Sequence, residues 1–296
     1  MIVLKRILVA TDFSPAARFA LARAGQLARQ HDASLHVVHA RPDLNLFCRA
    51  SSAGGEHYQG IFEHAEQALK EELAYLERTF AIQVRGETRM GRASETLAAA
   101  ITEIQPHLAV IGARGEHSAP AAAPFLGGTA LKLIAQTECP VLLVRKPGLA
   151  AYASALAAVD YSRDMARRLV DWATALLSEG DCHVVHAFDT PYVQRLRARG
   201  VSEAQIQACA EEARKTARNC VDDVLSGTFT AGRRLHAHLV CGEPIGAVLA
   251  EIARYQPDLA VIGQHRGAPL ENATRFVGTV SLRIAYHAQC DVLVVP

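Results

Sequence analysis

The segment QPHLAVIG at Gln105–Gly112 recurs later in the chain as QPDLAVIG at Gln256–Gly263. In both copies the apolar run Leu-Ala-Val-Ile directly precedes the final glycine. An unbroken apolar run bounded by turn residues is typical of a strand that is covered on both faces, as in a parallel sheet. The chain therefore contains two copies of one α/β domain.

Further matching segments extend the repeat over both halves. They are Leu8–Ser14 with Leu156–Ser162, His36–Ala40 with His183–Ala187, Phe125–Gly127 with Phe276–Gly278, and Cys139–Val144 with Cys290–Val295. The linker Lys146–Ala153 is rich in Pro, Gly and Ala, so we place the two domains at residues 1–146 and 154–296. A residue that the shared fold requires should recur, whereas one that differs indicates where the copies have diverged in function.

Short β runs alternate with helical patterns in each half, which predicts two five-stranded, doubly wound parallel sheets with right-handed crossovers. The strands expected in the first half are Arg6–Thr11, Ser34–Ala40, Ile82–Arg89, Leu108–Gly112 and Pro140–Val144. Those expected in the second half are Leu156–Val159, His183–Phe188, Leu235–Cys241, Leu259–Gly263 and Asp291–Val295. A polar, irregular stretch is expected at Pro42–Gly60, followed by a long helix from about Glu63 to Arg78.

The composition narrows the class of protein. Lys+Arg is 31 and Asp+Glu is 30 in 296 residues, so the net charge of +1 argues against nucleic acid or a membrane surface as partner. The sequence shows no apolar stretch long enough to span a membrane and no targeting segment. The seven cysteines are scattered without a Cys-x-x-Cys pair, so we expect free thiols in a cytoplasmic protein.

Ligands of doubly wound sheets bind beyond the carboxyl ends of the strands. Asp12 follows the first expected strand, Gly112 ends the fourth, and Gly127–Thr129 opens a helix. Glycines let the backbone approach an anion, and a helix start offers unpaired amides and a positive dipole. This pattern indicates a phosphate site, but the glycines could equally serve only to turn the chain.

Four motifs together resemble the universal stress protein family in its tandem two-domain form. They are Val9–Ser14, Val110–Gly115, Phe125–Ala130 and Cys139–Val144, and the resemblance covers nearly all of both halves. It implies two Rossmann-like α/β/α sandwiches related by a pseudo-twofold axis, with a role in the stress response. In this family domains pair through their last strand. The resemblance therefore implies pairing of Val141–Val144 with Val292–Val295, and a homodimer of tandem chains.

Many members of the family bind ATP through the pattern Gly-x2-Gly-x9-Gly-Ser/Thr. The resemblance thus implies ATP, or another adenine nucleotide, with its accompanying Mg²⁺, and places Asp12 against the adenine or ribose. The residues implied to line the base pocket are Ala10, Ala40 and Ile111. Those implied to follow the ribose and phosphates are Gly112, Arg114 and Gly115. Those implied to hold the phosphate tail are Gly127, Gly128 and Thr129.

Both copies depart from that glycine pattern. In the first copy the segment between Gly115 and Gly127, residues 116–126, is longer than the nine residues of the pattern. Gly128 stands where the pattern has Ser or Thr. The second copy keeps Asp160 in place of Asp12 and keeps the pair Gly278-Thr279. However, it has three residues between Gly263 and Gly267 instead of two. We favour nucleotide binding in the first copy and keep the second copy as the alternative.

Several histidines and cysteines could bind metal or react, but simpler structural roles are favoured for them. Histidines three apart on a strand, as in His36/His39 and His183/His186, point to opposite faces, so neither pair can chelate one ion. His236 and His238 do share a face, where a solvated pair is favoured over a metal site. Cysteine recurs before the last strand, at Cys139 and Cys290, which indicates a packing requirement rather than redox chemistry.

The sequence shows no nucleophile–base–orienter set and no P-loop. The favoured function is therefore that of a regulatory module that binds an adenine nucleotide, with an unknown protein partner. One alternative is a scaffold that has lost nucleotide binding and acts through protein contacts, which the altered loop lengths support. The other is a slow ATPase in which Asp12 or Asp160 assists hydrolysis.

Overall fold

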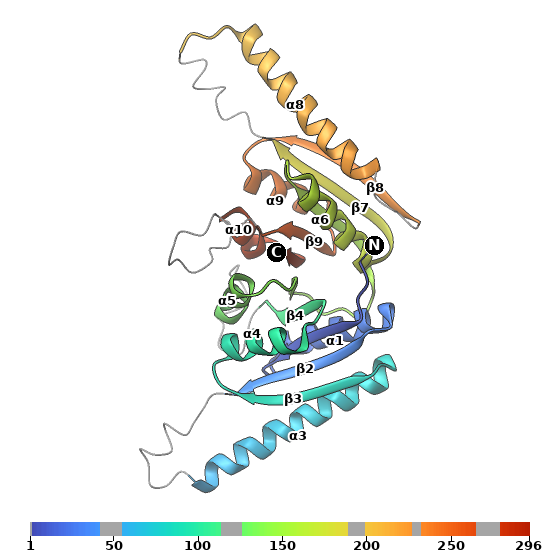
Figure 1. Cartoon of the computed structure of the whole chain (residues 1–296), viewed down its shortest axis with the longest axis vertical. Helices are drawn as coiled ribbons and strands as arrows, with labels where there is room; N and C mark the ends of the chain where they lie inside the picture. Colours follow the sequence, from blue (N-terminus) through green and yellow to red (C-terminus); the bar gives the residue numbers. More distant parts are fainter. Residues whose placement is uncertain (1, 42–54, 114–125, 189–198, 227–231, 265–278) are drawn as a thin grey trace. The chain divides into compact units, whose positions relative to one another are not determined.

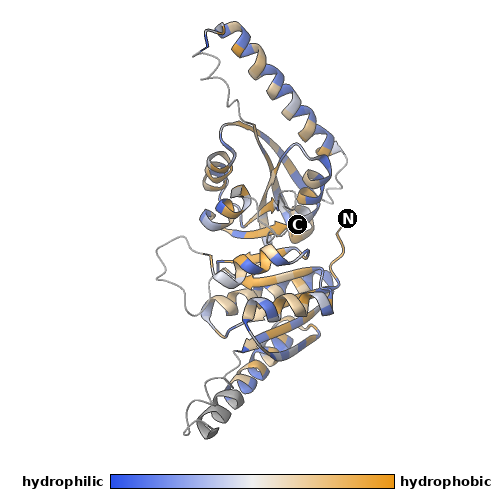
Figure 2. Cartoon of the chain, turned by 60° about the vertical axis from the view of Figure 1, so that its left-hand side comes forward, coloured by the Kyte–Doolittle hydropathy of each residue, from blue (hydrophilic) through white to orange (hydrophobic). Residues whose placement is uncertain are grey.

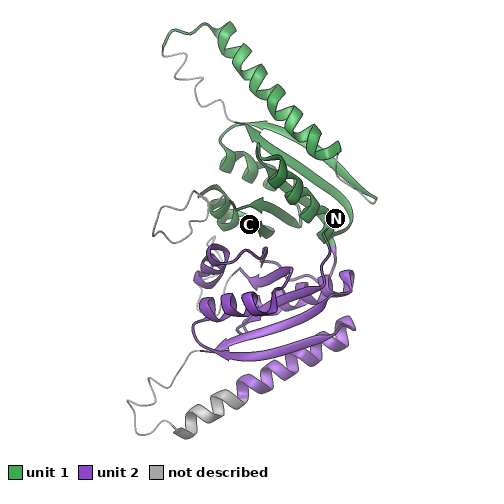
Figure 3. Ribbon diagram, in the orientation of Figure 1, with its two compact units in different colours: residues 1–2, 152–271, 277–295 green, residues 3–151, 272–276, 296 purple. Residues whose placement is uncertain are grey.

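The computed structural model describes residues 2–41, 55–113, 126–188, 199–226, 232–264 and 279–296. The chain divides into two compact units, formed mainly by Val3–Ala151 and by Tyr152–Glu271 with Val277–Val295 (Figure 3). Each unit contains one copy of the repeat. The second unit starts with a strand at Tyr152, so regular structure begins within the linker that the composition suggested.

The first unit contains, among its described residues, a parallel sheet in the order β3-β2-β1-β4-β5. Its strands are β1 (Arg6–Thr11), β2 (Ser34–Arg41), β3 (Val84–Met90), β4 (Leu108–Gly112) and β5 (Val141–Val144). Its helices are α1 (Pro15–His31), α3 (Gly55–Phe80), α4 (Ala93–Ile104) and α5 (Gly128–Gln136). Helix α1 contacts α3, and α4 contacts α5, so one pair covers each face of the sheet (Figure 1).

The second unit repeats this arrangement, with a parallel sheet in the order β10-β9-β6-β7-β8. Its strands are β6 (Tyr152–Val159), β7 (Leu177–Phe188), β8 (Arg233–Cys241), β9 (Leu259–Gly263) and β10 (Asp291–Val295). Its helices are α6 (Arg163–Leu176), α8 (Glu203–Ser226), α9 (Pro244–Tyr255) and α10 (Thr279–His287). Helix α6 contacts α8, and α9 contacts α10. The prediction of two tandem, doubly wound α/β domains is confirmed.

The repeated apolar segments form the centre of each unit. Every residue of β4 and of β9 is buried, as expected for strands with helices on both faces. Figure 2 shows the strands inside each unit mainly in the colours of apolar residues, whereas the helices alternate apolar and polar faces. Ser14-Pro15 predicts the start of a helix, because Ser is a favoured N-cap and Pro a favoured first helical residue. Helix α1 begins there, and the Ser14 hydroxyl accepts a hydrogen bond from the Ala17 amide.

Helix α3 and strands β6 and β7 begin four or more residues earlier than the sequence pattern indicates. Helix α3 starts at Gly55, inside the stretch that was expected to be irregular, because a helix once nucleated extends readily through polar residues of adequate propensity. Strands β6 and β7 start at Tyr152 and Leu177. Their pairing shifts register between Tyr152 and Ser154, and Gly180 on β7 has a φ of +110°. This irregularity breaks the alternation from which strands are recognised.

A buried polar pair ties the start of β6 to the start of β10. The Tyr152 hydroxyl lies 2.6 Å from Oδ2 of Asp291, and the two residues are 1% and 2% exposed. Removing the hydroxyl in Tyr152→Phe leaves a buried carboxyl oxygen without this donor, so the free energy of unfolding should fall by about 2 kcal/mol. Urea denaturation followed by the fluorescence of Trp172, a buried residue of α6 in the same unit, measures this change.

Tyr161→Phe serves as the control, because Tyr161 belongs to the same unit as Trp172, is 54% exposed, and its substitution should change stability by no more than about 0.5 kcal/mol. If Tyr152→Phe were no more destabilising than Tyr161→Phe, the hydrogen bond to Asp291 would not contribute to stability.

Candidate functional site

In the first unit the site residues expected from the sequence gather at one edge of the sheet. Strands β1 and β4 are parallel neighbours, with Val9 opposite Val110, so Asp12 and Gly112 follow them at the same edge. This edge lies where the chain crosses from one side of the sheet to the other, which is where doubly wound sheets bind ligands. The three residues implied for the base pocket differ in exposure: two are buried and one is half-buried, namely Ala10, Ile111 and Ala40.

A tight turn after β1 holds the Asp12 carboxylate. Its Oδ1 accepts a hydrogen bond of 3.0 Å from the Ser14 amide, and the Thr11 hydroxyl accepts one of 3.1 Å from the Phe13 amide. Phe13 takes a φ of +62°, which is unusual for a non-glycine residue. The second copy repeats the first of these bonds, with Asp160 Oδ1 accepting from the Ser162 amide at 2.9 Å. In both copies the aspartate is therefore oriented before any ligand binds.

A histidine also holds this turn in both copies, a role that our interpretation of the sequence missed. In the first copy Nδ1 of His39 lies 2.9 Å from the Thr11 carbonyl oxygen and the ring packs 4.4 Å from that of Phe13. In the second copy Nδ1 of His186 lies 3.0 Å from the Val159 carbonyl, and the ring contacts Tyr161 edge-on. Because a carbonyl only accepts, Nδ1 carries the proton. The recurrence of HVVHA in both halves was the signal that could have revealed this role.

A second residue that our sequence analysis missed is Glu72 on α3. Burial raises the pKa of its carboxyl, while the neighbouring Thr11 and Arg18 act in the opposite direction and the charge of Asp12 adds to the rise. The corresponding turn of the second unit faces a thiol instead, since Sγ of Cys220 lies 3.5 Å from the Asp160 carbonyl oxygen. The two copies thus share the aspartate but differ in the side chain next to its turn, which is Glu72 in the first copy and Cys220 in the second.

The helix starts near this edge are suited to an anion. Helix α5 has Gly127 as its N-cap, with no side-chain cap among the described residues and no acid in its first turn. A side chain at Gly128 would meet nothing within 4 Å, and half-buried Thr129 follows it. Helix α10 begins at Thr279, also without an acid in its first turn. Uncapped amides and an uncompensated dipole favour negative charge. Four expected site residues, and the side chain of Thr279, lie outside the described residues: Arg114, Gly115, Gly267 and Gly278.

In the second unit the same edge contains a cavity of about 170 Å³. Its lining includes the counterparts of five residues implied for the first copy (Ala10, Asp12, Ala40, Ile111 and Gly112). These counterparts are Ala158, Asp160, Ala187, Ile262 and Gly263. Side chains of α6, α9 and α10 complete the cavity, and most of them are apolar. The arrangement is a largely apolar recess with one carboxylate, Asp160, at the strand ends.

The floor of this cavity is held by contacts around Gly263. The hydroxyl of Ser281 on α10 donates to the Gly263 carbonyl, and the Gln264 amide donates to the Val295 carbonyl at 2.7 Å. A Cβ at Gly263 would lie 3.1 Å from Cγ of Met165. Met165 covers the strand end closely, so a side chain at position 263 would require the flexible Met165 side chain to shift. In the first copy Ala17 stands where the second copy has Met165, so this wall is bulkier in the second copy.

The two histidines of the first-copy motif HVVHA have different partners, and a cysteine precedes the last strand of each copy. His36 contacts Glu87 while His39 contacts the Thr11 carbonyl, so the two histidines do not share a partner. Burial raises the pKa of the Cys139 thiol to about 12, and Cys290 is buried, which suits packing rather than redox chemistry. All cysteines within the described ranges are free thiols.

The sequence matches the universal stress protein family model twice, over residues 4–145 and 151–296. The chain belongs to the universal stress protein family. It is 34% identical, over 149 residues, to a Thermus aquaticus protein described as "Universal stress protein in QAH/OAS sulfhydrylase 3'region". That match covers 48% of this chain and 98% of the relative. The described part of this universal stress protein contains no helix that is both long and apolar enough to cross a membrane.

Solved structures of the family share its fold. A universal stress protein from Archaeoglobus fulgidus DSM 4304 superposes with a TM-score of 0.66 at 17% identity, covering 98% of this chain and 95% of that chain. A universal stress protein in complex with cAMP matches 49% of this chain and 98% of its own length, at 20% identity and a TM-score of 0.37. The first of these matches extends the shared fold over both units.

Proposed function

We propose that this universal stress protein binds an adenine nucleotide and acts in the cytoplasm as a regulatory binding module of the stress response. The ligand that the family resemblance implies is ATP. The observation that carries the proposal is the cavity of the second unit. Its lining includes Asp160 and the second-copy counterparts of the three implied base-pocket residues, namely Ala158, Ala187 and Ile262. We therefore assign the binding site to the second copy, although the glycine pattern alone favoured the first.

The chemistry of the cavity suits the base end of a nucleotide. A purine presents apolar faces to the aliphatic lining, and a carboxylate can accept hydrogen bonds from its amino group or from ribose hydroxyls. A volume of about 170 Å³ is smaller than the roughly 300–1,000 Å³ of sites that enclose a whole ligand. The base would therefore fill the recess while the phosphates extend toward the first amides of α10.

Any Mg²⁺ would arrive with the nucleotide. Among the described residues no three His, Cys, Asp or Glu side chains form a site that could hold a metal ion. Phosphate-bound Mg²⁺ commonly needs only one or two protein carboxylates, because the phosphates and water supply the remaining ligands. ATP hydrolysis is not part of the proposal.

Mass spectrometry of the small molecules released from protein purified without added nucleotide tests the proposal, together with calorimetric titration with ATP. We expect an adenine nucleotide in the released fraction or saturable binding in the titration. If neither were observed, the nucleotide proposal would be wrong, and the scaffold that acts through protein contacts would replace it. Accumulation of ADP from ATP over time would instead support the slow ATPase.

Asp160→Asn separates the two copies. The substitution keeps the shape of the side chain but removes a charged acceptor. A hydrogen bond to a charged group contributes about 1.5–3 kcal/mol, so affinity for ATP should fall about 10- to 150-fold. The matched control is Asp12→Asn in the first copy, which should leave affinity at the second site unchanged. Calorimetry of both variants measures the effect, and the opposite result would place the site in the first copy.

We also propose that the two copies pair through β5 and β10 and that tandem chains form homodimers. Val141–Val144 is apolar throughout, as is Val292–Val295, and each lies in an end strand of its unit's sheet, whose edge needs cover. Light scattering of the full chain should give the mass of a dimer, and a monomer mass at micromolar concentration would contradict the homodimer.

A further inference from the structure

Three histidines gather on one face of β7 and β8 in the second unit. His183 on β7 lies opposite His236 on β8, and Nδ1 of His183 is 3.0 Å from Nε2 of His238. The His183 ring is 5.2 Å from each of the other two rings and stacks at 4.1 Å on Tyr255 of α9. The sequence pattern grouped His236 with His238, but the closest pair of nitrogens joins residues of different strands. None of these side chains lines the cavity described above.

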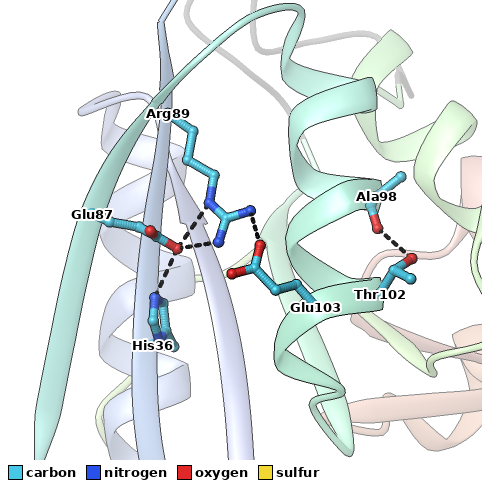
Figure 4. Close-up of polar contacts among 6 residues, drawn as sticks. All are labelled: His36, Glu87, Arg89, Ala98, Thr102 and Glu103. Carbon is cyan, nitrogen blue, oxygen red and sulfur yellow. Dashed lines mark hydrogen bonds and ion pairs between the residues drawn. The ribbon is translucent and has the colours of Figure 1, made fainter.

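The first copy fills the same positions with an ion-pair network (Figure 4). His36 lies opposite Arg85 as His183 lies opposite His236, and the position of His238 is taken by Glu87. Glu87 lies 3.0 Å from Nε2 of His36 and 2.7 Å from Arg89, which also binds Glu103 at 2.8 Å. The second copy has therefore replaced a carboxylate that pairs with an arginine by an imidazole that pairs with another imidazole.

We infer that His183 and His238 form a binding site for a divalent transition-metal ion that prefers imidazole ligands, such as Ni²⁺, Cu²⁺ or Zn²⁺. Two nitrogens bound to one tetrahedral zinc at 2.0–2.1 Å lie about 3.3 Å apart. The observed separation of 3.0 Å is close to this value. A metal ion can thus take the place of the proton that now lies between the two rings, with a small outward movement of the side chains.

A neighbouring hydroxyl can fix the orientation of His238 as a ligand. The Tyr255 hydroxyl lies 3.2 Å from Nδ1 of His238, so it can accept a hydrogen bond from Nδ1–H while Nε2 binds the ion. Nε2 of His236 lies 2.7 Å from Oδ1 of Asp181, so this nitrogen is already engaged. Since the described residues hold no preformed cage of three ligands, water would complete the coordination.

The charges that face the pair come from three elements. Asp181 lies on β7, Arg234 and His236 on β8, and Glu251 and Arg254 on α9. Nε of Arg234 lies 2.8 Å from Oδ1 of Asp181, so the opposite charges of these two side chains offset each other.

Burial, followed by the neighbouring histidines, lowers the pKa of His183. Burial also comes first in lowering the pKa of His238, where Glu251 acts in the opposite direction. Both shifts favour the neutral imidazole, which is the form that binds metal.

Calorimetric titration of the full chain with Ni²⁺ at neutral pH tests the site. Wild type should bind Ni²⁺, and His183→Ala or His238→Ala should each weaken binding at least about 10-fold. Tyr255→Phe removes the hydroxyl that orients the His238 ring and should weaken Ni²⁺ binding about 10- to 100-fold. His36→Ala is the matched control in the first copy and should bind as wild type. His238→Glu, which restores the first-copy residue, should weaken binding while keeping a polar group in place.

Far-UV circular dichroism confirms that each variant is folded before it is titrated. Wild type that binds no Ni²⁺ would overturn the inference, even if protonation of the cluster still changed stability. Unchanged binding in the double variant His183→Ala/His238→Ala would also overturn it and would assign the ion to other groups, such as the exposed thiols of Cys209 and Cys241. Because cavity and cluster share no residue, loss of ATP binding would not bear on this result.

Discussion

Ala158→Phe is expected to abolish nucleotide binding to the second unit while leaving that unit folded. Ala158 lies near the end of β6, lines the cavity of about 170 Å³ and is half-buried, so a larger side chain can extend into the recess instead of into the core. A phenyl ring there would occupy the space proposed for the base. Affinity for ATP, measured by calorimetry, should fall at least about 100-fold, equivalent to roughly 3 kcal/mol.

Ala158→Ser is the matched control, because its hydroxyl adds little volume and should leave binding nearly unchanged. Thermal unfolding of both variants should stay close to that of wild type. ATP binding by Ala158→Phe with wild-type affinity would exclude this cavity as the site and direct attention to Asp12 and Gly112 in the first copy.

Gly180→Ala should destabilise the second unit by at least about 3 kcal/mol, which combines backbone strain with a steric clash. Gly180 has a φ of +110°, and a Cβ built there would lie 2.0 Å from the Ala153 carbonyl oxygen. Backbone on a neighbouring strand cannot move aside as the end of a flexible side chain can. Urea denaturation followed by Trp172 fluorescence reports on this unit, since the chain contains only one tryptophan.

Gly232→Ala separates the two contributions. Gly232 also has a positive φ, +84°, but a Cβ there would meet nothing within 4 Å. Its substitution should therefore cost only the strain of a left-handed conformation, about 1–2 kcal/mol. Equal effects of the two substitutions would show that the approach of Ala153 to Gly180 contributes nothing.

The sequence predicted most of the architecture because the relevant physics is local or periodic. Strands β1 and β4 span the residues that the sequence indicated, Arg6–Thr11 and Leu108–Gly112, since unbroken apolar runs have few alternatives in a covered sheet. Helix α1 was equally well defined by its Ser-Pro start. The early starts of β6 and β7 were not predictable, because a bulge at Gly180 interrupts the pattern.

The candidate site was only partly predictable. Asp12 and Asp160 were found because they recur after the first strand of each copy, and both are held by the same type of turn. Glu72 was missed because α3 is distant in the sequence from the turn that it faces.

Two α/β domains, each with an aspartate after its first strand, follow from the amino-acid sequence of this universal stress protein, because the duplication and the apolar periodicity can be recognised along the chain. Which side chains meet across neighbouring strands follows only from the folded sheet. The parallel register places His183 beside His236 and His238, whereas in the first copy it places His36 beside Glu87. The physical reason is that parallel neighbours are joined through long crossovers. The register between them is set by packing of the whole sheet and not by any short segment.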